Sequence, residues 1–423
     1  MIRREILKEV LLDNRNEVVK HQVIPRSFQF EEFGNYVFVG IRRAGKSFLL
    51  YQRIQELLHN GHTWNEMLYV NFEDERLLEM TADDLNTILE IGLEISGTDR
   101  PMLFLDEIQN IDGWDKFVRR LADNKYRAYV TGSNAKMLSQ DVATTLGGRY
   151  ITVHVYPYDF KEFLYANGVE VTENSLFATE SRAEIKRIFN DYFRSGGFPE
   201  GASLAAKRDY LTSVYQKIYL GDIAARHSIE NTFALRILFR KLAESIKQPV
   251  SFTRITNIVA STGVKISKNT VINYMEYAKD ACLLIPIQNI ADKLVERETN
   301  PKYYFADNGI LNLLLLDADT SLLENLVAVT LLRRYGTDDA VFFYNRNVEV
   351  DFYLPDTGVA IQVCYAMNLS DETFQREVQA LVKLNKVFEC RQLLIITYDD
   401  EERIELEKCA IEVIPVWKWL LGK

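Results

Sequence analysis

The sequence predicts an α/β fold in which a parallel β-sheet carries helices on both faces. Short apolar runs of strand length recur along the first third of the chain, and stretches of helix length separate the earlier ones. A glycine-containing turn follows the first run and leads directly into a helix-like stretch at 47–58. Such alternation is typical of a parallel sheet buried on both sides. The predicted strands are 36–40 (YVFVG), 67–74 (MLYVNFED), 102–107 (MLFLDE), 128–133 (AYVTGS) and 151–156 (ITVHVY).

Length and composition indicate a globular protein of several domains. The chain has 423 residues, 47% hydrophobic and 26% charged, and at roughly 100 to 200 residues per domain this predicts two to four domains. No run approaches the ~18 consecutive apolar residues of a membrane span, and the N-terminus lacks the apolar segment of a signal peptide. We therefore expect a cytoplasmic protein with no membrane partner. The cysteines lack metal-ligand spacing, which favours reduced thiols at Cys282, Cys364, Cys390 and Cys409.

The distribution of charge singles out one segment of the chain. The whole chain has a formal charge of -10, which argues against a protein whose entire surface binds nucleic acid. Between 235 and 300, however, ten basic residues stand against six acidic ones. The order helix, turn at Gly263, helix and strand in this segment is typical of a winged helix-turn-helix, with 270–279 as its recognition-like helix.

The remaining segments differ in their predicted secondary structure. An N-terminal helical segment precedes the strand-rich core, and long helical stretches after Pro157 predict a lid or connector. The last hundred residues restart with a helix and continue as strands, a helix and a strand, which predicts a further small α/β domain. The boundaries we expect are 1–30, 31–156 (core), 157–230 (lid or connector), 231–318 (winged helix) and 319–423.

The turn after the first strand is a phosphate-binding motif. Residues 40–47, GIRRAGKS, match G-x-x-x-x-G-K-[ST] in full, between a strand and a helix as the motif requires. Backbone N–H groups and the helix N-terminus would surround the phosphates of ATP, Lys46 would pair with the β and γ oxygens, and Ser47 would hold Mg²⁺. The residues expected to contact ATP are Gly40, Ile41, Arg42, Arg43, Ala44, Gly45, Lys46, Ser47, Phe48 and Ser133.

Acidic and polar residues at the ends of later strands complete the predicted site. Asp106 ends a buried strand, where it would bind the metal with Ser47, and Glu107 follows where a base for the attacking water is needed. The polar side chains of the next strand end, Thr131-Gly132-Ser133-Asn134, either reach the γ-phosphate or the attacking water or form an ordinary strand-end turn. Arg149, after two glycines, is either a transition-state arginine or a solvated turn residue. The predicted catalytic residues are Glu107, Lys46, Arg149 and Asn134.

At this point the sequence resembles a known family. The segments GIRRAGKSFLL, LFLDEIQN, VTGSNAKML, GGRY, GGFPE, PKYYFADNGIL and EVDFYL, in this order, are similar to AAA-type predicted ATPases of bacteria and archaea with a C-terminal domain of unknown function. The resemblance covers nearly the whole chain. It implies an ASCE-type P-loop domain, a winged helix and a domain resembling the PD-(D/E)XK nuclease fold. It also implies Glu107 as the catalytic glutamate, Ser133 or Asn134 as a sensor, and Arg149 as an arginine finger.

The nuclease-like domain departs from the pattern that the resemblance implies. Glu324, Asp351 and Gln362 take the positions of the metal-binding residues, and Glu349 lies near them, but Cys364 stands where a lysine is expected. A cysteine supplies no cation, and glutamine in place of glutamate weakens a metal site. We therefore expect a nuclease fold without efficient nuclease activity.

Two functions fit these observations. In the first, an ATPase uses Mg²⁺-dependent hydrolysis to move the winged helix and the nuclease-like domain, with DNA as a partner. In the second, nucleotide holds a signalling or DNA-binding switch that turns over slowly and acts on protein partners. Lys265 and Lys268 flank the turn of the winged helix and favour some contact with DNA. The sequence leaves open whether the protein forms an oligomer, in which Arg149 would act on a neighbouring chain.

Overall fold

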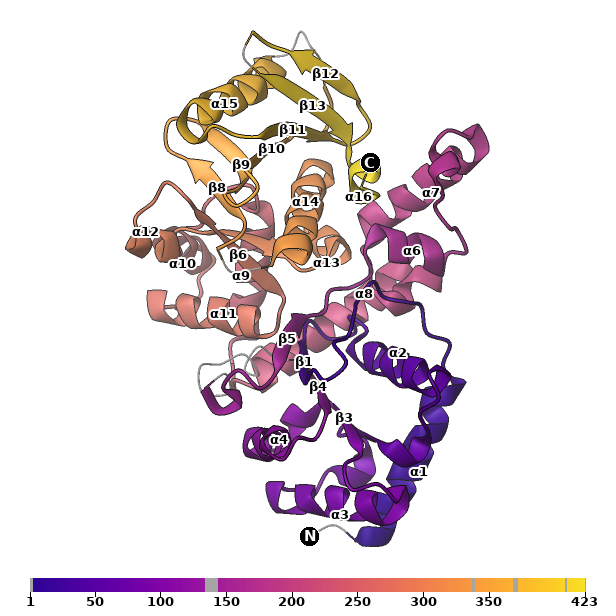
Figure 1. The fold of residues 1–423 in the computed structure, drawn as a ribbon. Coiled ribbons are helices and arrows are strands. Elements are labelled where there is room, and N and C mark those ends of the chain that lie inside the picture. The colour runs from indigo at the N-terminus through magenta and orange to yellow at the C-terminus, as the bar shows by residue number, and fades with distance from the viewer. Residues whose placement is uncertain (1–2, 134–143, 337–338, 368–371, 408, 423) are drawn as a thin grey trace. The chain divides into compact units, whose positions relative to one another are not determined.

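The computed structural model describes residues 3–133, 144–336, 339–367, 372–407 and 409–422. The chain divides into two compact units, shown in one ribbon in Figure 1. The first unit comprises Met1–Tyr156 with Asp280–Cys282, and the second comprises Pro157–Lys279 with Leu283–Lys423.

The first unit contains a sheet of five parallel strands in the order β2-β3-β4-β1-β5. All five predicted strands are present, which confirms the parallel sheet. Because β4 separates β1 from β3, the carboxyl end of β4 lies between the loop after β1 and the carboxylates after β3. The strands are β1 Tyr36–Val39, β2 Met67–Asn71, β3 Met102–Asp106, β4 Ala128–Gly132 and β5 Ile151–His154.

The two faces of this sheet differ in chemistry. One face is aromatic: the rings of Phe104 and Tyr129 stack with centroids 4.6 Å apart, and Arg53 of α2 donates a hydrogen bond to the Tyr129 hydroxyl (3.3 Å). The other face is aliphatic and packs on side chains of α1, α3 and α4, among them Leu7, Val10, Leu11, Ile88, Ile91, Phe117, Val118 and Leu121. Helices therefore cover both faces (Figure 1): α1 Arg4–Lys20, α2 Lys46–His59, α3 Leu85–Ser96 and α4 Trp114–Asp123.

The second unit begins with helices. None of the helices in the described residues of the chain is long and apolar enough to cross a membrane. The helices of this unit are α6 Phe160–Ala166, α7 Thr179–Ser195, α8 Lys207–Gln216, the π-helix η8 Lys217–Ala225, α9 Thr232–Glu244, α10 Phe252–Ser261, α11 Lys268–Asp280, α12 Leu294–Thr299, α13 Asn308–Leu314, α14 Asp319–Tyr335, α15 Glu372–Phe388 and α16 Val416–Leu420.

One mixed sheet runs through the second unit in the order β12-β13-β11-β10-β9-β8-β6-β7. Its strands β6 and β7 come from the segment 231–318, and the others come from 319–423, so the two predicted segments share a sheet. Asn289 of β6 helps join them, because its side chain bonds both the N–H (3.0 Å) and the carbonyl (2.9 Å) of Asn345. The strands are β6 Leu284–Asn289, β7 Lys302–Phe305, β8 Phe342–Asn345, β9 Glu349–Leu354, β10 Val359–Val363, β11 Gln392–Thr397, β12 Glu402–Glu405 and β13 Ala410–Pro415.

A buried carboxylate connects two of the sequence segments that carry the family resemblance. Asp307, before α13, accepts hydrogen bonds from the N–H groups of Gly197 and Gly309, both at 2.7 Å. A Cβ atom on Gly196 would lie 1.8 Å from the Asp307 carboxylate, so only glycine fits there. Burial raises the pKa of Asp307 to about 6, although these N–H groups oppose the shift. The GGFPE and ADNG segments therefore form one structural junction.

Replacing Asp307 with alanine is expected to destabilise the second unit by about 2–4 kcal/mol, because two buried N–H groups lose their acceptor. Urea unfolding followed by tryptophan fluorescence measures the change. Asp317→Ala is the matched control, since Asp317 is exposed after α13 and its loss should change stability by less than ~0.5 kcal/mol. Equal stability of the two variants would contradict the structural role of Asp307.

Candidate functional site

The loop between β1 and α2 runs close against the neighbouring strand. A Cβ on Gly40 would lie 2.0 Å from the carbonyl oxygen of Val155, so the loop leaves β1 where only glycine fits. Arg43 and Gly45 then take left-handed backbone angles, with φ of 62° and 95°. Left-handed turns of this kind allow backbone N–H groups to surround an anion at the start of a helix, where the helix dipole also favours it.

Lys46, the first residue of α2, points back into this loop. It is 3% exposed, and its ammonium donates to the carbonyls of Gly40 (3.1 Å) and Ile41 (3.2 Å). It also lies 3.5 Å from Glu107 Oε1. The lysine of the motif and the predicted catalytic base therefore lie together at the carboxyl edge of the sheet.

Asp106 is fixed by hydroxyl groups from three elements. Tyr69 of β2 donates to Asp106 Oδ2 (2.8 Å), Thr131 of β4 donates to Oδ1, and Ser47 of α2 also hydrogen-bonds the carboxylate. Burial raises the pKa of Asp106 to about 6, the charge of Glu107 adds to the shift, and the three hydroxyl groups oppose it. Ser47 and Asp106 are thus adjacent oxygen donors, as a Mg²⁺ ion bound mainly by phosphates and water requires.

Glu107 has a strained backbone and a well-defined side chain. Its φ of 54° and ψ of 41° are left-handed, which is uncommon for a residue other than glycine, and its N–H donates to Thr131 Oγ1 (2.9 Å). Gln109 donates to Glu107 Oε2 at 2.5 Å. Burial alone would raise the pKa of Glu107, but the Lys46 ammonium and the Gln109 amide outweigh it, and the pKa lies below its usual value. The carboxylate is therefore charged at neutral pH, as a base must be.

The other residues predicted to contact ATP each have different neighbours in the structure. Ser133 hydrogen-bonds Glu107 and lies 3.5 Å from the Gln109 amide nitrogen, inside the cluster. Arg42 pairs with Glu73 at 3.1 Å. Phe48 is 37% exposed and packs edge-on against His21. Asn134 lies outside the described residues.

Arg149 is not brought to this site within the same chain. Its guanidinium pairs with Asp123 at the end of α4, at 2.5 Å. Arg149 precedes β5, which lies parallel to β1 with Ile151 beside Tyr36. It therefore lies at the amino edge of the sheet, whereas the loop lies at the carboxyl edge, a separation of roughly 13 Å along a strand of this length.

Sequence reasoning missed the roles of three residues in holding the carboxylates of the site. Tyr69 and Thr131 hold Asp106, and Gln109 holds Glu107, yet none of them was expected to have this role. The parallel register could have indicated one of them, because Asn71 lies opposite Asp106, which places Tyr69 two residues before that point on the adjacent strand. The side-chain amide oxygen of Gln109 is buried without a partner among the described residues.

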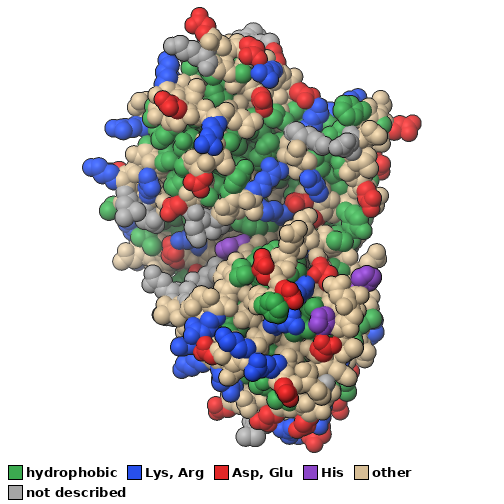
Figure 2. Space-filling model, in the orientation of Figure 1, with side chains coloured by type: hydrophobic (Ala, Val, Ile, Leu, Met, Phe, Trp, Pro, Cys, Tyr) green, Lys and Arg blue, Asp and Glu red, His purple; other side chains and the backbone are tan. Residues whose placement is uncertain are grey.

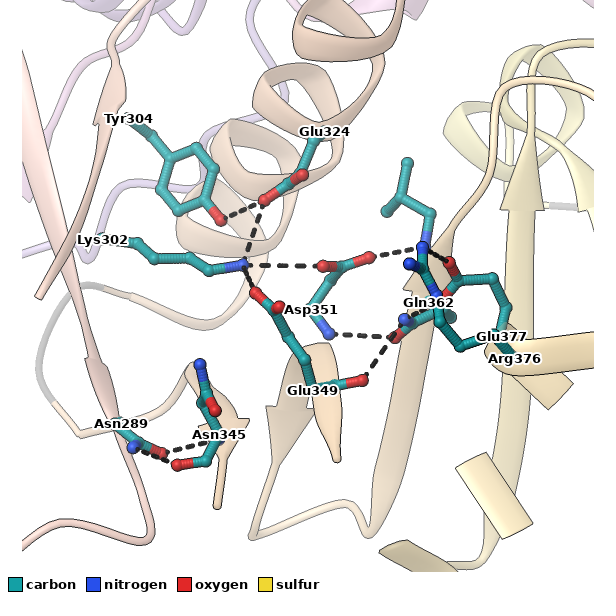
Figure 3. A network of polar contacts seen from close by, with 11 residues as sticks. Asn289, Lys302, Tyr304, Glu324, Asn345, Glu349, Asp351, Gln362, Arg376 and Glu377 are labelled. Atoms are coloured by element: carbon teal, nitrogen blue, oxygen red, sulfur yellow. Dashed lines mark hydrogen bonds and ion pairs between the residues drawn. The ribbon is translucent and has the colours of Figure 1, made fainter. Parts of the chain in front are cut away.

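The acidic residues of the predicted nuclease-like domain also lie together, in the second unit (Figure 3). Asp351 of β9 and Gln362 of β10 are joined by the bond from the Asp351 N–H to Gln362 Oε1 (3.0 Å), and Glu324 projects from α14 toward them. Cys364 adds no cation, but Lys302 of β7 does: its ammonium lies 3.4 Å from Glu324 Oε1 and 3.5 Å from Asp351 Oδ1. The cluster thus contains a cation that the sequence pattern did not indicate, because the lysine comes from a strand outside 319–423.

Family models and sequence relatives indicate the family of this chain. A model described as an AAA domain matches residues 33–164, and a model described as a domain of unknown function (DUF8612) matches 186–321. An uncharacterized protein of Methanocaldococcus jannaschii is 36% identical, with 100% of this chain and 96% of that protein covered. The chain therefore belongs to the same protein family as this relative. An uncharacterized protein of Haemophilus influenzae is 31% identical over 91% of this chain and 94% of its own length. The first unit of this family member has the AAA-type P-loop ATPase fold.

Solved structures show more distant likeness. The Walker-type ATPase PABY2304 of Pyrococcus abyssi is 15% identical, covers 74% of this chain and 96% of its own, and has a TM-score of 0.43. The Aeropyrum pernix ORC1 protein, solved in complex with DNA, is 14% identical, with 74% and 92% covered and a TM-score of 0.26. Scores this low do not establish a shared arrangement of the whole chain, so the family assignment depends on the sequence relatives. The nuclease-like fold of 319–423 stays a prediction.

Proposed function

We propose that the first unit binds ATP with Mg²⁺ and hydrolyses it. The observation that carries this proposal is the convergence of Lys46, Ser47, Asp106 and Glu107 at one edge of the sheet, with the Lys46 ammonium 3.5 Å from Glu107 Oε1. A buried cation, two adjacent oxygen donors and a charged base are the groups that phosphoryl transfer to water needs.

Each side chain has a separate task in this reaction. Magnesium ATP, when bound, supplies the γ-phosphoryl group and a cation that neutralises phosphate charge. Lys46 exchanges its bonds to the Gly40 and Ile41 carbonyls for phosphate oxygens, and Ser47 and Asp106 hold Mg²⁺. Glu107 orients the attacking water and accepts its proton, while Thr131 and Gln109 keep the Glu107 carboxylate in place. The test is steady-state ATP hydrolysis by the wild type beside Glu107→Gln.

Hydrolysis would act on the second unit. In this proposal the segment 157–230 transmits the change, and the winged-helix segment 231–318 and the segment 319–423 respond to it.

The alternative is a nucleotide-held switch with slow turnover, which acts through a protein partner. Tight ATP binding with turnover that Glu107→Gln leaves unchanged would favour the switch. If Arg149 acts as an arginine finger, it does so on a neighbouring chain, and activity of a chain that stays monomeric with ATP in gel filtration would contradict that role.

The segment α9–α11 favours contact with DNA. Lys265 and Lys268 are both exposed at the start of α11 and the turn before it. Changing both to glutamate is expected to weaken the binding of double-stranded DNA by about tenfold or more and to flatten its dependence on salt, because two phosphate contacts are lost. Fluorescence anisotropy at several salt concentrations measures both effects.

A second basic surface of the protein provides the control. Figure 2 shows basic side chains gathered where α4 lies, and α4 carries the exposed residues Lys116 and Arg119. Changing these two to glutamate alters the net charge equally but leaves α9–α11 intact. A larger loss of DNA affinity in this control than in the Lys265 and Lys268 variant would assign DNA contact to the first unit. Equal affinity of all three proteins would contradict DNA binding through the winged-helix segment.

A further inference from the structure

The ammonium of Lys302 lies at the centre of the acidic cluster in the second unit (Figure 3). Lys302 is 0% exposed, and its Nζ lies 3.4 Å from Glu324 Oε1, 3.1 Å from Glu349 Oε1 and 3.5 Å from Asp351 Oδ1. The ring of Phe343 lies against the same ammonium, 5.4 Å from its centroid. One cation is thus shared by three carboxylates that come from α14 and β9.

The surroundings keep this lysine charged. Burial alone would lower the pKa of Lys302, but the nearby carboxylates outweigh it and hold the pKa above its usual value. Contacts of 3.1 to 3.5 Å are longer than the ~2.8 Å of a tight ammonium–carboxylate pair, so the charge is divided among the three acids. A buried charge shared in this way is stabilised only while its partners remain, and they depend on it in turn.

Two of the three carboxylates are also held in place from outside the cluster. Tyr304 donates to Glu324 Oε1 (2.8 Å), and the N–H of Val363 donates to Asp351 Oδ2 (2.9 Å). The cluster opens into a cavity of about 640 Å³ that is also lined by Lys247, Gln362, Arg376 and Glu377. Converging carboxylates beside a polar cavity are the oxygen donors that Mg²⁺ or Mn²⁺ would use. Around the ammonium, however, no three His, Cys, Asp or Glu side chains of the described residues are arranged to hold a metal ion.

We propose that the Lys302 ammonium is a built-in cation that takes the place of a divalent metal ion among Glu324, Glu349 and Asp351, and that it keeps Mg²⁺ and Mn²⁺ out of this pocket. Lys302 and a metal ion compete for the same carboxylate oxygens. Once the ammonium is removed, Glu324, Glu349 and Asp351 are free to rearrange around a divalent cation, which their arrangement around the ammonium does not hold. This pocket of the second unit therefore excludes divalent metal ions in the wild type, independently of ATP hydrolysis in the first unit.

The experiment is calorimetric titration of the full chain with MnCl₂ in the absence of nucleotide. Lys302→Met keeps the length of the side chain and removes its charge. This variant is expected to bind one Mn²⁺ ion about tenfold or more tightly than the wild type, and adding Asp351→Asn should abolish the gain. Lys247→Met is the matched control, because Lys247 lines the same cavity outside the cluster and bonds Thr320 (2.8 Å). It should bind Mn²⁺ no better than the wild type.

A second variant keeps the test decisive if Lys302→Met does not fold. Lys302→Met combined with Glu349→Gln removes one charge of each sign, and Glu349 is 45% exposed at its side chain. This variant retains Glu324 and Asp351, and it is expected to gain Mn²⁺ binding more weakly than the single variant. Wild-type binding of Mn²⁺ that Asp351→Asn removes would overturn the proposal. Absence of any gain in the folded variants would overturn it as well.

Discussion

Replacement of Glu107 with glutamine is expected to reduce the rate of ATP hydrolysis by about 100-fold or more, and to leave ATP binding within about threefold of the wild type. The amide keeps the size of the side chain but cannot accept a proton from water. ATP binding persists because Lys46, Ser47 and the loop backbone are unchanged. The measurements are the initial rate of phosphate release and the affinity for a fluorescent ATP analogue.

Glu73→Gln is the matched control for this result. Glu73 pairs with Arg42 of the same loop at 3.1 Å, but its side chain is 46% exposed, and it does not contact Lys46 in the described structure. Its replacement is expected to change the rate by less than about threefold, as for an exposed ion pair. A Glu107→Gln variant that hydrolyses ATP as fast as Glu73→Gln would remove Glu107 from the role of base.

Replacement of Lys46 with methionine is expected to weaken ATP binding by about 100-fold or more and to abolish measurable turnover. The ammonium is buried within the loop, where it donates to the carbonyls of Gly40 and Ile41. Glu107 would also lose the cation that lowers its pKa, so its carboxylate would be a poorer partner for water.

The readout for Lys46→Met separates binding from folding. Circular dichroism and the midpoint of urea unfolding without nucleotide test whether the fold is intact. The shift of that midpoint by ATP then reports binding, because a ligand of the native state stabilises it by mass action. The exposed residue Lys116 supplies the control variant Lys116→Met, which should retain the full shift. An ATP-induced shift in Lys46→Met as large as in the control would contradict the proposed nucleotide site.

Much of the first unit was predictable because its signals are local. Each strand is a short apolar run bounded by polar turns, and the P-loop is recognisable from eight consecutive residues. Lys46, Ser47, Asp106 and Glu107 were therefore identified correctly as neighbours. The contacts by which Tyr69, Thr131 and Gln109 hold the two carboxylates were not predicted, because they depend on the register of adjacent strands and on a left-handed turn at Glu107.

The second unit was harder to predict because its key contacts join distant residues. Lys302 lies 22 positions before Glu324 in the sequence. It belongs to a segment whose order of helices and strand predicted a separate domain. Lys302 contacts Glu349 and Asp351 because β6 and β7 extend the sheet formed by the last hundred residues. Likewise, the placement of Arg149 at the amino edge of the first sheet depends on the pairing of β5 with β1. No local pattern encodes these pairings.

The most direct test of the central claim is the steady-state release of phosphate from ATP by the full chain with Mg²⁺, with and without double-stranded DNA, beside Glu107→Gln. Turnover is expected in the wild type, should disappear when Mg²⁺ is chelated and should be nearly lost in Glu107→Gln. Stimulation by DNA would further couple the reaction to the second unit. ATP hydrolysis that continues unchanged in Glu107→Gln, or a wild type that neither binds nor hydrolyses ATP, would contradict the account.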